Sequence, residues 1–250
     1  MGKTDDHNCN IRGKPEMNKK VLLAAIFAGF MGYQAQAAAP HSGFSIGGNL
    51  GYTSVDGKLS RVFDTVPPTV VDSSNFGGRS PVFGLFLGYG WVASSPGLYL
   101  GGEIFGQIEN VDAKRQDFIN LVGIGLTTTL KSNNTLGAVA KIGYVCKEAL
   151  FFAKFGVTTT KWKFNFANTP NAAGGIGAQS VSTNSRKTGF VMGLGMDYAI
   201  AKNWAIGAEF LYTIYGSIKS SVPVNDQAVA ASFTYKPKVA TTNLRLKYTF

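Results

Sequence analysis

Apolar residues alternate with small or polar residues, with a period of two, in eight stretches of the chain. In the first stretch, Phe44, Ile46, Leu50 and Tyr52 alternate with residues such as Ser45. Because successive side chains of a strand point to opposite faces, each stretch predicts a strand with one apolar face. The predicted strands are residues 44–54, 82–92, 98–109, 136–146, 151–163, 189–199, 204–216 and 239–250.

The length of these stretches indicates a membrane protein. Each has about eleven residues, and a tilted strand needs about nine to eleven to cross a bilayer. Downstream of residue 37 no segment approaches the roughly eighteen consecutive apolar residues of a transmembrane helix. A closed barrel is the other structure that satisfies its backbone in lipid. We therefore predict an all-β fold, a closed antiparallel up-and-down transmembrane β-barrel of eight strands.

The connections between the predicted strands alternate in length. Short links are predicted at residues 93–97, 147–150 and 200–203, and long ones at 55–81, 110–135, 164–188 and 217–238. Outer-membrane barrels have short periplasmic turns and long extracellular loops, so the pattern predicts four long surface loops and both termini in the periplasm.

A barrel of ten strands is the alternative, because residues 122–130 and 229–235 also alternate. A spanning strand at 121–130 would move the long 164–188 connection to the periplasmic side. We therefore favour a hairpin extension above the membrane for this segment.

The N-terminal region predicts export. The basic segment Met17–Lys20 precedes the apolar residues 21–32, and Ala35 and Ala37 form a small-x-small cleavage site before Ala38. Twelve apolar residues rise about 18 Å, which is too short for a hydrocarbon core of about 30 Å. We predict an upstream extension over 1–16, a signal peptide over 17–37 and an outer-membrane barrel over 38–250.

Charge and composition agree with this location. Only 15% of the residues are charged, which is low for a soluble surface. Downstream of residue 37, nineteen Lys and Arg face eleven Asp and Glu, a net charge of +8. This excess predicts contact with outer-membrane lipids and anionic lipopolysaccharide, whereas the exported location argues against nucleic acid.

The exported chain holds few residues for catalysis. It has one histidine, His41, and one cysteine, Cys146, so neither a disulfide nor a Cys–His metal site is supported. The pair His41–Ser42 resembles half of a lipase-like site, but a polar leader is the simpler interpretation. We expect no enzyme, no cofactor and no metal, with a lipid-modifying enzyme as a distant alternative.

Charged residues also occur on the polar side of the predicted strands, about three to six residues from the turn end. Measured from the turn end, that position lies about 8 to 15 Å into the membrane-spanning apolar band, which is about 25 Å tall. They are Glu103, Lys141, Lys154, Asp197, Glu209, Arg245 and Lys247. An eight-stranded barrel is just filled by its inward side chains, so we predict one charged layer across the lumen. Opposite charges should meet on neighbouring strands: Glu103 with Lys141, Lys154 with Asp197, and Glu209 with Arg245 or Lys247. The alternative is separately hydrated charges in a water-filled pore.

The chain ends in NLRLKYTF, with Leu244, Leu246, Tyr248 and the terminal Phe250 at alternate positions. With this ending the chain resembles the small outer-membrane β-barrel family of the OmpA transmembrane domain, OmpX and the opacity-type surface proteins. The resemblance implies that the barrel-assembly machinery reads these residues. The alternative interpretation is a last amphipathic strand.

Two functions remain open from the sequence. The first is a surface-exposed structural protein whose four long loops bind a host or surface ligand. The second is a narrow diffusion channel for ions or small solutes.

Overall fold

The computed structural model describes residues 41–63, 69–93, 97–119, 124–169, 180–224 and 229–250. The predicted upstream extension, the signal peptide and its cleavage residues Ala35, Ala37 and Ala38 lie outside this part of the chain. No helix among the described residues is long and apolar enough to span a bilayer.

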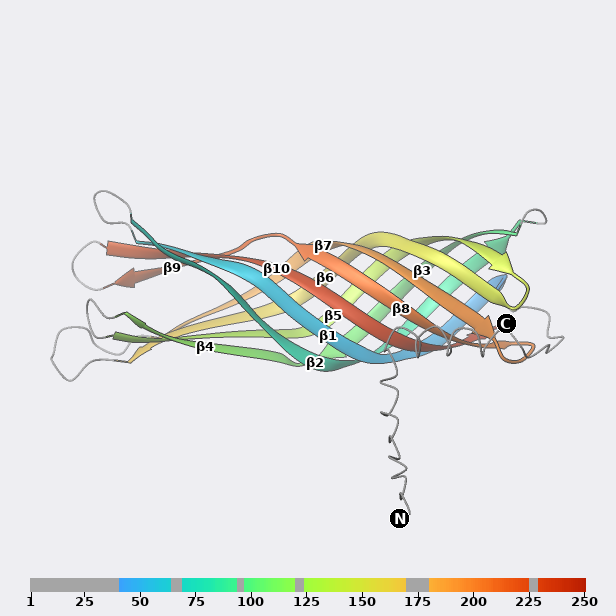
Figure 1. Cartoon of the computed structure of the whole chain (residues 1–250), viewed down its shortest axis with the longest axis horizontal. Coiled ribbons are helices and arrows are strands. Elements are labelled where there is room, and N and C mark those ends of the chain that lie inside the picture. The colour runs from blue at the N-terminus through green and yellow to red at the C-terminus, as the bar shows by residue number, and fades with distance from the viewer. Residues whose placement is uncertain (1–40, 64–68, 94–96, 120–123, 170–179, 225–228) are drawn as a thin grey trace, which may run out of the picture. The chain divides into compact units, whose positions relative to one another are not determined.

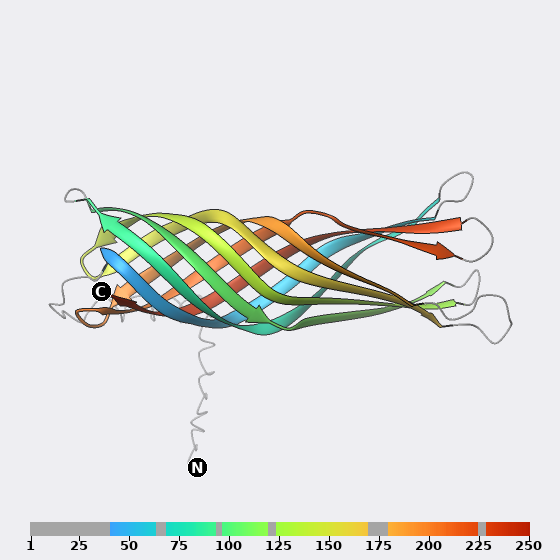
Figure 2. The same ribbon diagram turned by 180° about the vertical axis from the view of Figure 1, so that it is seen from behind.

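Ten antiparallel strands make up the described structure (Figures 1 and 2). They are β1 (Gly43–Phe63), β2 (Thr69–Val92), β3 (Leu98–Glu109), β4 (Val111–Ile119), β5 (Ile124–Cys146), β6 (Ala149–Thr169), β7 (Ser180–Ala199), β8 (Trp204–Tyr215), β9 (Ile218–Val224) and β10 (Val229–Thr249).

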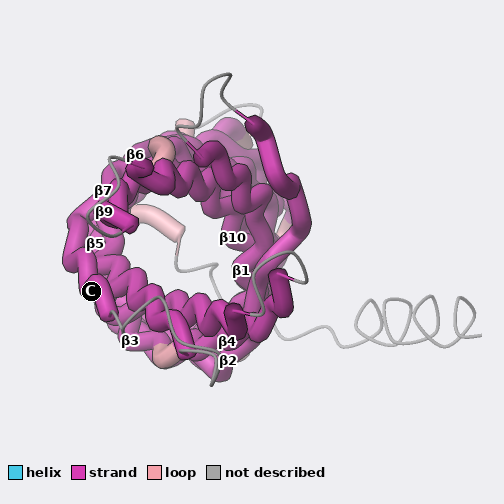
Figure 3. Tube along the Cα trace, turned by 90° about the vertical axis from the view of Figure 1, so that its left-hand side faces the viewer, coloured by secondary structure: helices cyan, strands magenta, loops and turns pink. Residues whose placement is uncertain are grey.

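Eight of these strands form a closed ring, as predicted. The ring order is β1-β2-β3-β5-β6-β7-β8-β10, and β10 pairs with β1 to close it. Figure 3 looks along the barrel and shows the strands surrounding its axis. The ten-stranded alternative is wrong, because β4 and β9 continue β3 and β8 beyond the ring and pair only with β5 and β10.

The strand ends agree with the prediction at the short turns and differ at the long connections. At the short-turn end β3 begins at Leu98 and β8 at Trp204, as the sequence predicts. At the other end most residues predicted as loop are strand: β1 has 21 residues and β2 has 24. Polar residues face water on one side there and apolar residues pack on the other, so the same period continues with its faces exchanged.

Beyond the ring the wall divides into two sheets. The pairing of β2 with β3 ends at Val82–Glu109, and the pairing of β7 with β8 ends at Gly189–Tyr215. One sheet then has the order β9-β10-β1-β2 and the other β4-β5-β6-β7. Both layers are visible at the left-hand end of Figure 1. We call this part the extension; it comprises residues 55–63, 69–80, 111–119, 124–133, 161–169, 180–188, 218–224 and 229–238.

An apolar core fills the space between the two sheets of the extension. Its largest members are aromatic: Trp162 and Phe164 come from β6, and Phe233 and Tyr235 from β10. The Trp162 ring meets that of Tyr215 at 5.4 Å between centroids, edge to face. The Tyr235 hydroxyl donates a hydrogen bond of 2.8 Å to the carbonyl of Phe76 on β2. The extension is therefore a packed two-layer structure rather than a set of separate loops.

The outer wall of the ring is apolar. Most of the large side chains that point outward there are at least 38% exposed. They include Phe44, Leu50, Leu85, Leu87, Ile104, Ile108, Leu136, Phe155, Val157, Phe190, Leu194, Phe210 and Leu244. Such a belt suits the hydrocarbon of a bilayer, and aromatic residues follow it at the short-turn end, with Trp204 5.0 Å from Tyr248.

Candidate functional site

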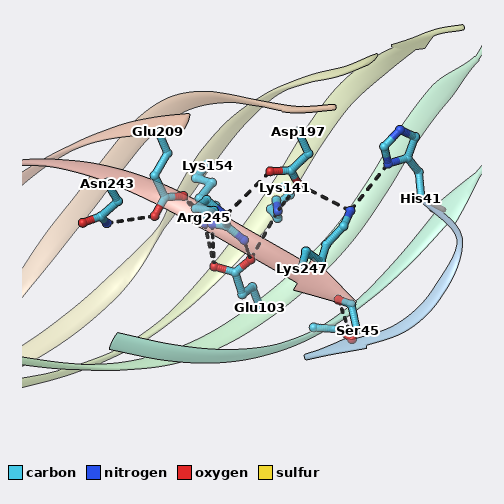
Figure 4. Close-up of polar contacts among 11 residues, drawn as sticks. His41, Ser45, Glu103, Lys141, Lys154, Asp197, Glu209, Asn243, Arg245 and Lys247 are labelled. Carbon is cyan, nitrogen blue, oxygen red and sulfur yellow. Dashed lines mark hydrogen bonds and ion pairs between the residues drawn. The ribbon is translucent and has the colours of Figure 1, made fainter. Parts of the chain in front are cut away.

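All seven charged residues proposed from the sequence for the lumen lie on the inner wall of the ring. Each side chain is at most 5% exposed. They come from β3, β5, β6, β7, β8 and β10, and they meet at one level (Figure 4). Three acids and four bases form one continuous network, which we call the charged layer.

Arg245 lies at the centre of the charged layer, because its guanidinium contacts all three carboxylates. Its Nη2 is 2.7 Å from Glu103 Oε2, and its Nε is 3.7 Å from Asp197 Oδ1. Its Nη1 donates to Glu209 Oε2. The guanidinium also stacks on Phe86, 4.0 Å from the ring centroid. A planar donor with five N–H groups can bridge several acids, which an ammonium does less well.

Two lysines join the same acids from the other side of the lumen. Lys154 Nζ is 2.6 Å from Glu103 Oε1 and 2.6 Å from Glu209 Oε2. Lys141 Nζ is 3.2 Å from Glu103 Oε2 and 3.9 Å from Asp197 Oδ2. Since an isolated buried charge costs several kcal/mol, these reciprocal contacts are what allow seven charges in so small a space.

His41 and Lys247 continue the network toward the short-turn end. Lys247 Nζ is 3.4 Å from Asp197 Oδ2 and 3.5 Å from His41 Nδ1. His41 Nε2 lies 3.3 Å from the carbonyl of Glu148, so Nε2 donates and Nδ1 accepts. Burial, together with the nearby Lys247 ammonium, lowers the pKa of His41 from 6.5 to about 4. The imidazole is therefore neutral at pH 7.

The ion pairs reach farther than the sequence indicated. Glu103–Lys141 and Glu209–Arg245 join neighbouring strands of the ring, as expected. The expected pair of Lys154 with Asp197 is wrong, because Lys154 instead contacts Glu103 and Glu209. Glu103–Arg245, Glu103–Lys154 and Lys154–Glu209 join strands that are not neighbours in the ring, because a narrow barrel brings every inward side chain of one level together. Sequence reasoning also missed Asn243, which donates to Glu209 Oε1 at 3.0 Å. Its place two residues before Arg245, on the same face, is the pattern that could have identified it.

Packed side chains close the lumen on both sides of the charged layer. Toward the short-turn end lie Tyr99, Leu150 and Phe152, with Lys141 Nζ 4.1 Å from the Phe152 centroid. Toward the extension lies an apolar cluster of Phe86, Phe105, Val139, Val191 and Leu211. The next level is polar and encloses a cavity of about 10 Å³, room for about one water molecule.

The residues with catalytic potential do not form a catalytic arrangement. Ser42 Oγ accepts a hydrogen bond from the amide of Val92, while His41 faces Glu148 and Lys247. Cys146 is exposed and unpaired at the short turn between β5 and β6. Within the described ranges, no group of three or more His, Cys, Asp or Glu side chains could hold a metal ion.

The C-terminal residues expected to act in assembly lie on the outer wall. Leu244 is 66% exposed and Phe250 is 75% exposed. Tyr248 packs edge to face on Phe250, with ring centroids 5.1 Å apart. With Leu246 they form an apolar stripe along β10, next to β1.

Comparisons with known proteins give one family match and two kinds of relative. Residues 23–250 match the family described as "Outer membrane protein beta-barrel domain". The chain is 29% identical, over 79% of its length and 88% of the relative's, to the 31 kDa outer-membrane immunogenic protein of Brucella melitensis. Among solved structures it is similar to the attachment invasion locus protein Ail of Yersinia pestis, with 15% identity and a TM-score of 0.30 over 80% of this chain and 99% of that one. The chain is also similar to Neisserial surface protein A, with 11% identity and a TM-score of 0.35. This match covers 80% of this chain and 97% of that one.

Proposed function

Because this chain belongs to the outer membrane protein beta-barrel domain family and is an integral outer-membrane protein, we propose that its ring is a closed anchor for the extension. In this proposal the short turns face the periplasm and the extension stands on the cell surface, where it and the loops at its tip bind a host or surface ligand. Lipopolysaccharide is the proposed partner at the membrane surface.

The filling of the lumen is the observation that carries this proposal. Along the barrel axis, the packed levels marked by Phe152, Arg245 and Phe86 are followed by the polar level with its small cavity and then by the apolar core around Trp162. A diffusion channel would need a continuous water path through all of them. A single filled level could move aside as a gate, but a charged level and a polar level that lie between packed apolar levels favour an anchor over a channel.

Conductance separates the anchor from the channel. We expect refolded protein in a planar bilayer to give small or intermittent currents. Steady openings of large conductance in the wild type would contradict the closed anchor and support a narrow diffusion channel.

The outward position of the extension has its own test, which uses the native cysteine as a reference. Cys146 is exposed at the short-turn end, and Asn165 is exposed on the outer face of β6 in the extension. A maleimide carried on a polyethylene glycol too large for porins should label Asn165→Cys in a Cys146→Ser background on intact cells. Wild-type Cys146 should react only after the membrane is broken. The reverse labelling would place the extension in the periplasm and contradict the proposal.

A partner of a different kind is proposed for the C-terminus. The outward stripe that ends in Phe250 supports recognition by the barrel-assembly machinery, since the resemblance in the last residues implies that role. Deleting Phe250 should reduce the heat-modifiable, folded form in the outer membrane while export continues. Phe44→Ala, which removes a similarly exposed ring on β1, is the control. An unchanged amount of folded protein without Phe250 would leave only the amphipathic-strand interpretation.

A further inference from the structure

On three adjacent strands, the outer wall changes from apolar to basic at one level. Val157 on β6 and Phe190 on β7 are large, outward-facing apolar residues near the upper limit of the belt. A few residues farther toward the extension, the outward positions hold four cations. These are Lys131 on β5, Lys161 and Lys163 on β6, and Arg186 on β7, and we call them the basic patch.

The strand register places like charges opposite one another within the basic patch. Lys131 pairs with Lys163 across β5 and β6, and Lys161 pairs with Arg186 across β6 and β7. Directly opposite residues on one face have Cβ atoms about 4.5 to 5.5 Å apart, and like charges there are destabilising. Two such pairs side by side are therefore a cost to the isolated protein.

The described part of the chain offers this patch little compensation. Lys131 Nζ is 2.9 Å from Asp112 Oδ2 on β4, and both side chains are about 40% exposed. Among the described residues, no carboxylate lies within ion-pair distance of Lys161, Lys163 or Arg186, all of which are exposed. The charged layer shows the contrary pattern, because every cation there meets an acid.

We propose that the basic patch binds the phosphate groups of lipopolysaccharide in the outer leaflet, which rests on the surface orientation of the extension proposed above. Phosphates at this site would contribute the missing negative charge. The guanidinium of Arg186 can donate to two phosphate oxygens at once, and the lysines can approach as mobile point charges.

The position of the patch favours a lipid over a soluble polyanion. On the same face of β6, Lys161 lies two positions beyond Thr159 and four positions beyond Val157, so the first cation lies about 13 Å along the strand from the apolar belt. Because the strand is tilted, the height of this cation above the apolar belt is smaller than the distance along the strand. One amphiphile can thus place acyl chains on Phe155 and Val157 and its phosphates at the patch.

The test measures lipopolysaccharide binding by refolded protein in detergent. Lys161→Gln combined with Arg186→Gln should lower the affinity for purified lipopolysaccharide about tenfold, as expected from losing charge-assisted hydrogen bonds. Dephosphorylated lipopolysaccharide should bind the wild type as weakly as intact lipopolysaccharide binds the variant. Lys147→Gln combined with Lys202→Gln removes the same charge from exposed turns at the opposite end and should leave the affinity within about twofold.

A second measurement uses the opposed charges directly. Without lipopolysaccharide, Lys161→Gln should keep or raise the unfolding temperature, because it relieves repulsion from Arg186. With lipopolysaccharide, the same variant should gain less stability than the wild type. The proposal would be overturned if lipopolysaccharide raised the unfolding temperature of the variant and of the wild type equally. It would also be overturned if the variant lost binding to heparin, a soluble polyanion, but kept its affinity for lipopolysaccharide. The Asn165→Cys labelling reports orientation independently, so failure of this inference is distinguishable from failure of the surface anchor.

Discussion

The ring and the extension are built from the same strands, yet their inner and outer faces have opposite chemistry. In the ring part of β6, Lys154 points into the lumen and Phe155 points outward. In its extension part Trp162 points inward and Lys163 points outward. The alternation never loses phase on β6, so only the identity of the residues on each face changes.

This reversal follows from the solvent on the outer side. Where lipid surrounds the wall, apolar side chains belong outside, and the few inward positions of a narrow barrel can hold paired charges. Where water surrounds the wall, the apolar side chains must find one another inside, as in any two-sheet sandwich. The level at which the faces exchange therefore marks the edge of the hydrocarbon region.

Breaking the charged layer should have the largest effect on the ring. Arg245→Met leaves three buried carboxylates with fewer cations, so we expect a loss of about 3 to 5 kcal/mol in the free energy of unfolding. Urea unfolding in lipid, followed by heat-modifiable gel mobility, measures it.

The matched variant adds Glu103→Gln to Arg245→Met. Breaking a buried pair costs more than removing both charges, so the double variant should recover a large part of the loss. Two variants of equal stability would show hydrated, independent charges and contradict the network.

Cavity formation in the extension tests whether the two regions unfold together. Trp162 is 1% exposed, and truncating a buried aromatic side chain costs about 3 to 5 kcal/mol. Trp162→Ala should make the extension sensitive to added protease while the ring keeps its urea midpoint. A fall of the whole barrel's midpoint by the full amount would mean that ring and extension form one cooperative unit.

Exchanging one outward residue in each region should sharpen the boundary. Leu194→Lys places a cation on the lipid-facing wall, which costs about 2 to 4 kcal/mol near the bilayer midplane. Asn165→Leu, on the water-facing wall, should change stability by no more than about 0.5 kcal/mol. Unfolding measured in the same lipid compares them, and similar costs would refute the assignment of the two solvents.

The smallest effect is expected from pH at the short-turn end. Unfolded His41 takes up a proton near pH 6.5, whereas folded His41 does so only near pH 4. The unfolded state therefore binds more protons between these values, and stability contributed by the neutral ring falls as the pH falls from 6.5 to 4. His41→Gln should flatten this part of the stability–pH curve, while an identical slope in the variant would assign the dependence to other groups.

The sequence predicted the ring better than the extension. A period of two, with lipid outside, identifies the apolar face of each ring strand, and short turns fix where strands such as β3 begin. In the extension the period persists, but residues such as Asn75, Asn165 and Ser182 were predicted to be loop because their segments are polar. Only the partner sheet shows that Leu130 and Phe164 are core.

The charged layer was accessible to sequence reasoning in position but not in partners. The alternation of side chains along a strand places Glu103 and Arg245 on the inner face, and their distance from the turn places them at similar heights. Which acid meets which base depends on the width of the ring and on rotamers, neither of which a period encodes. The contribution of His41 was hidden because it precedes the first strand and has no partner in the pattern.

The contact between Glu103 and Arg245 joins residues 142 positions apart, on β3 and the last strand. No hairpin formed early can satisfy it, since Arg245 arrives only when β10 docks on β1 and β8. A contact of such long sequence separation contributes only after the entropy cost of closing a long loop has been overcome. Until then three carboxylates have fewer cations than they need, so a sheet that has not closed is penalised by its own interior. The charged layer thus favours the closed ring over an open sheet, because Arg245 reaches Glu103 and Glu209 only when β10 is in place.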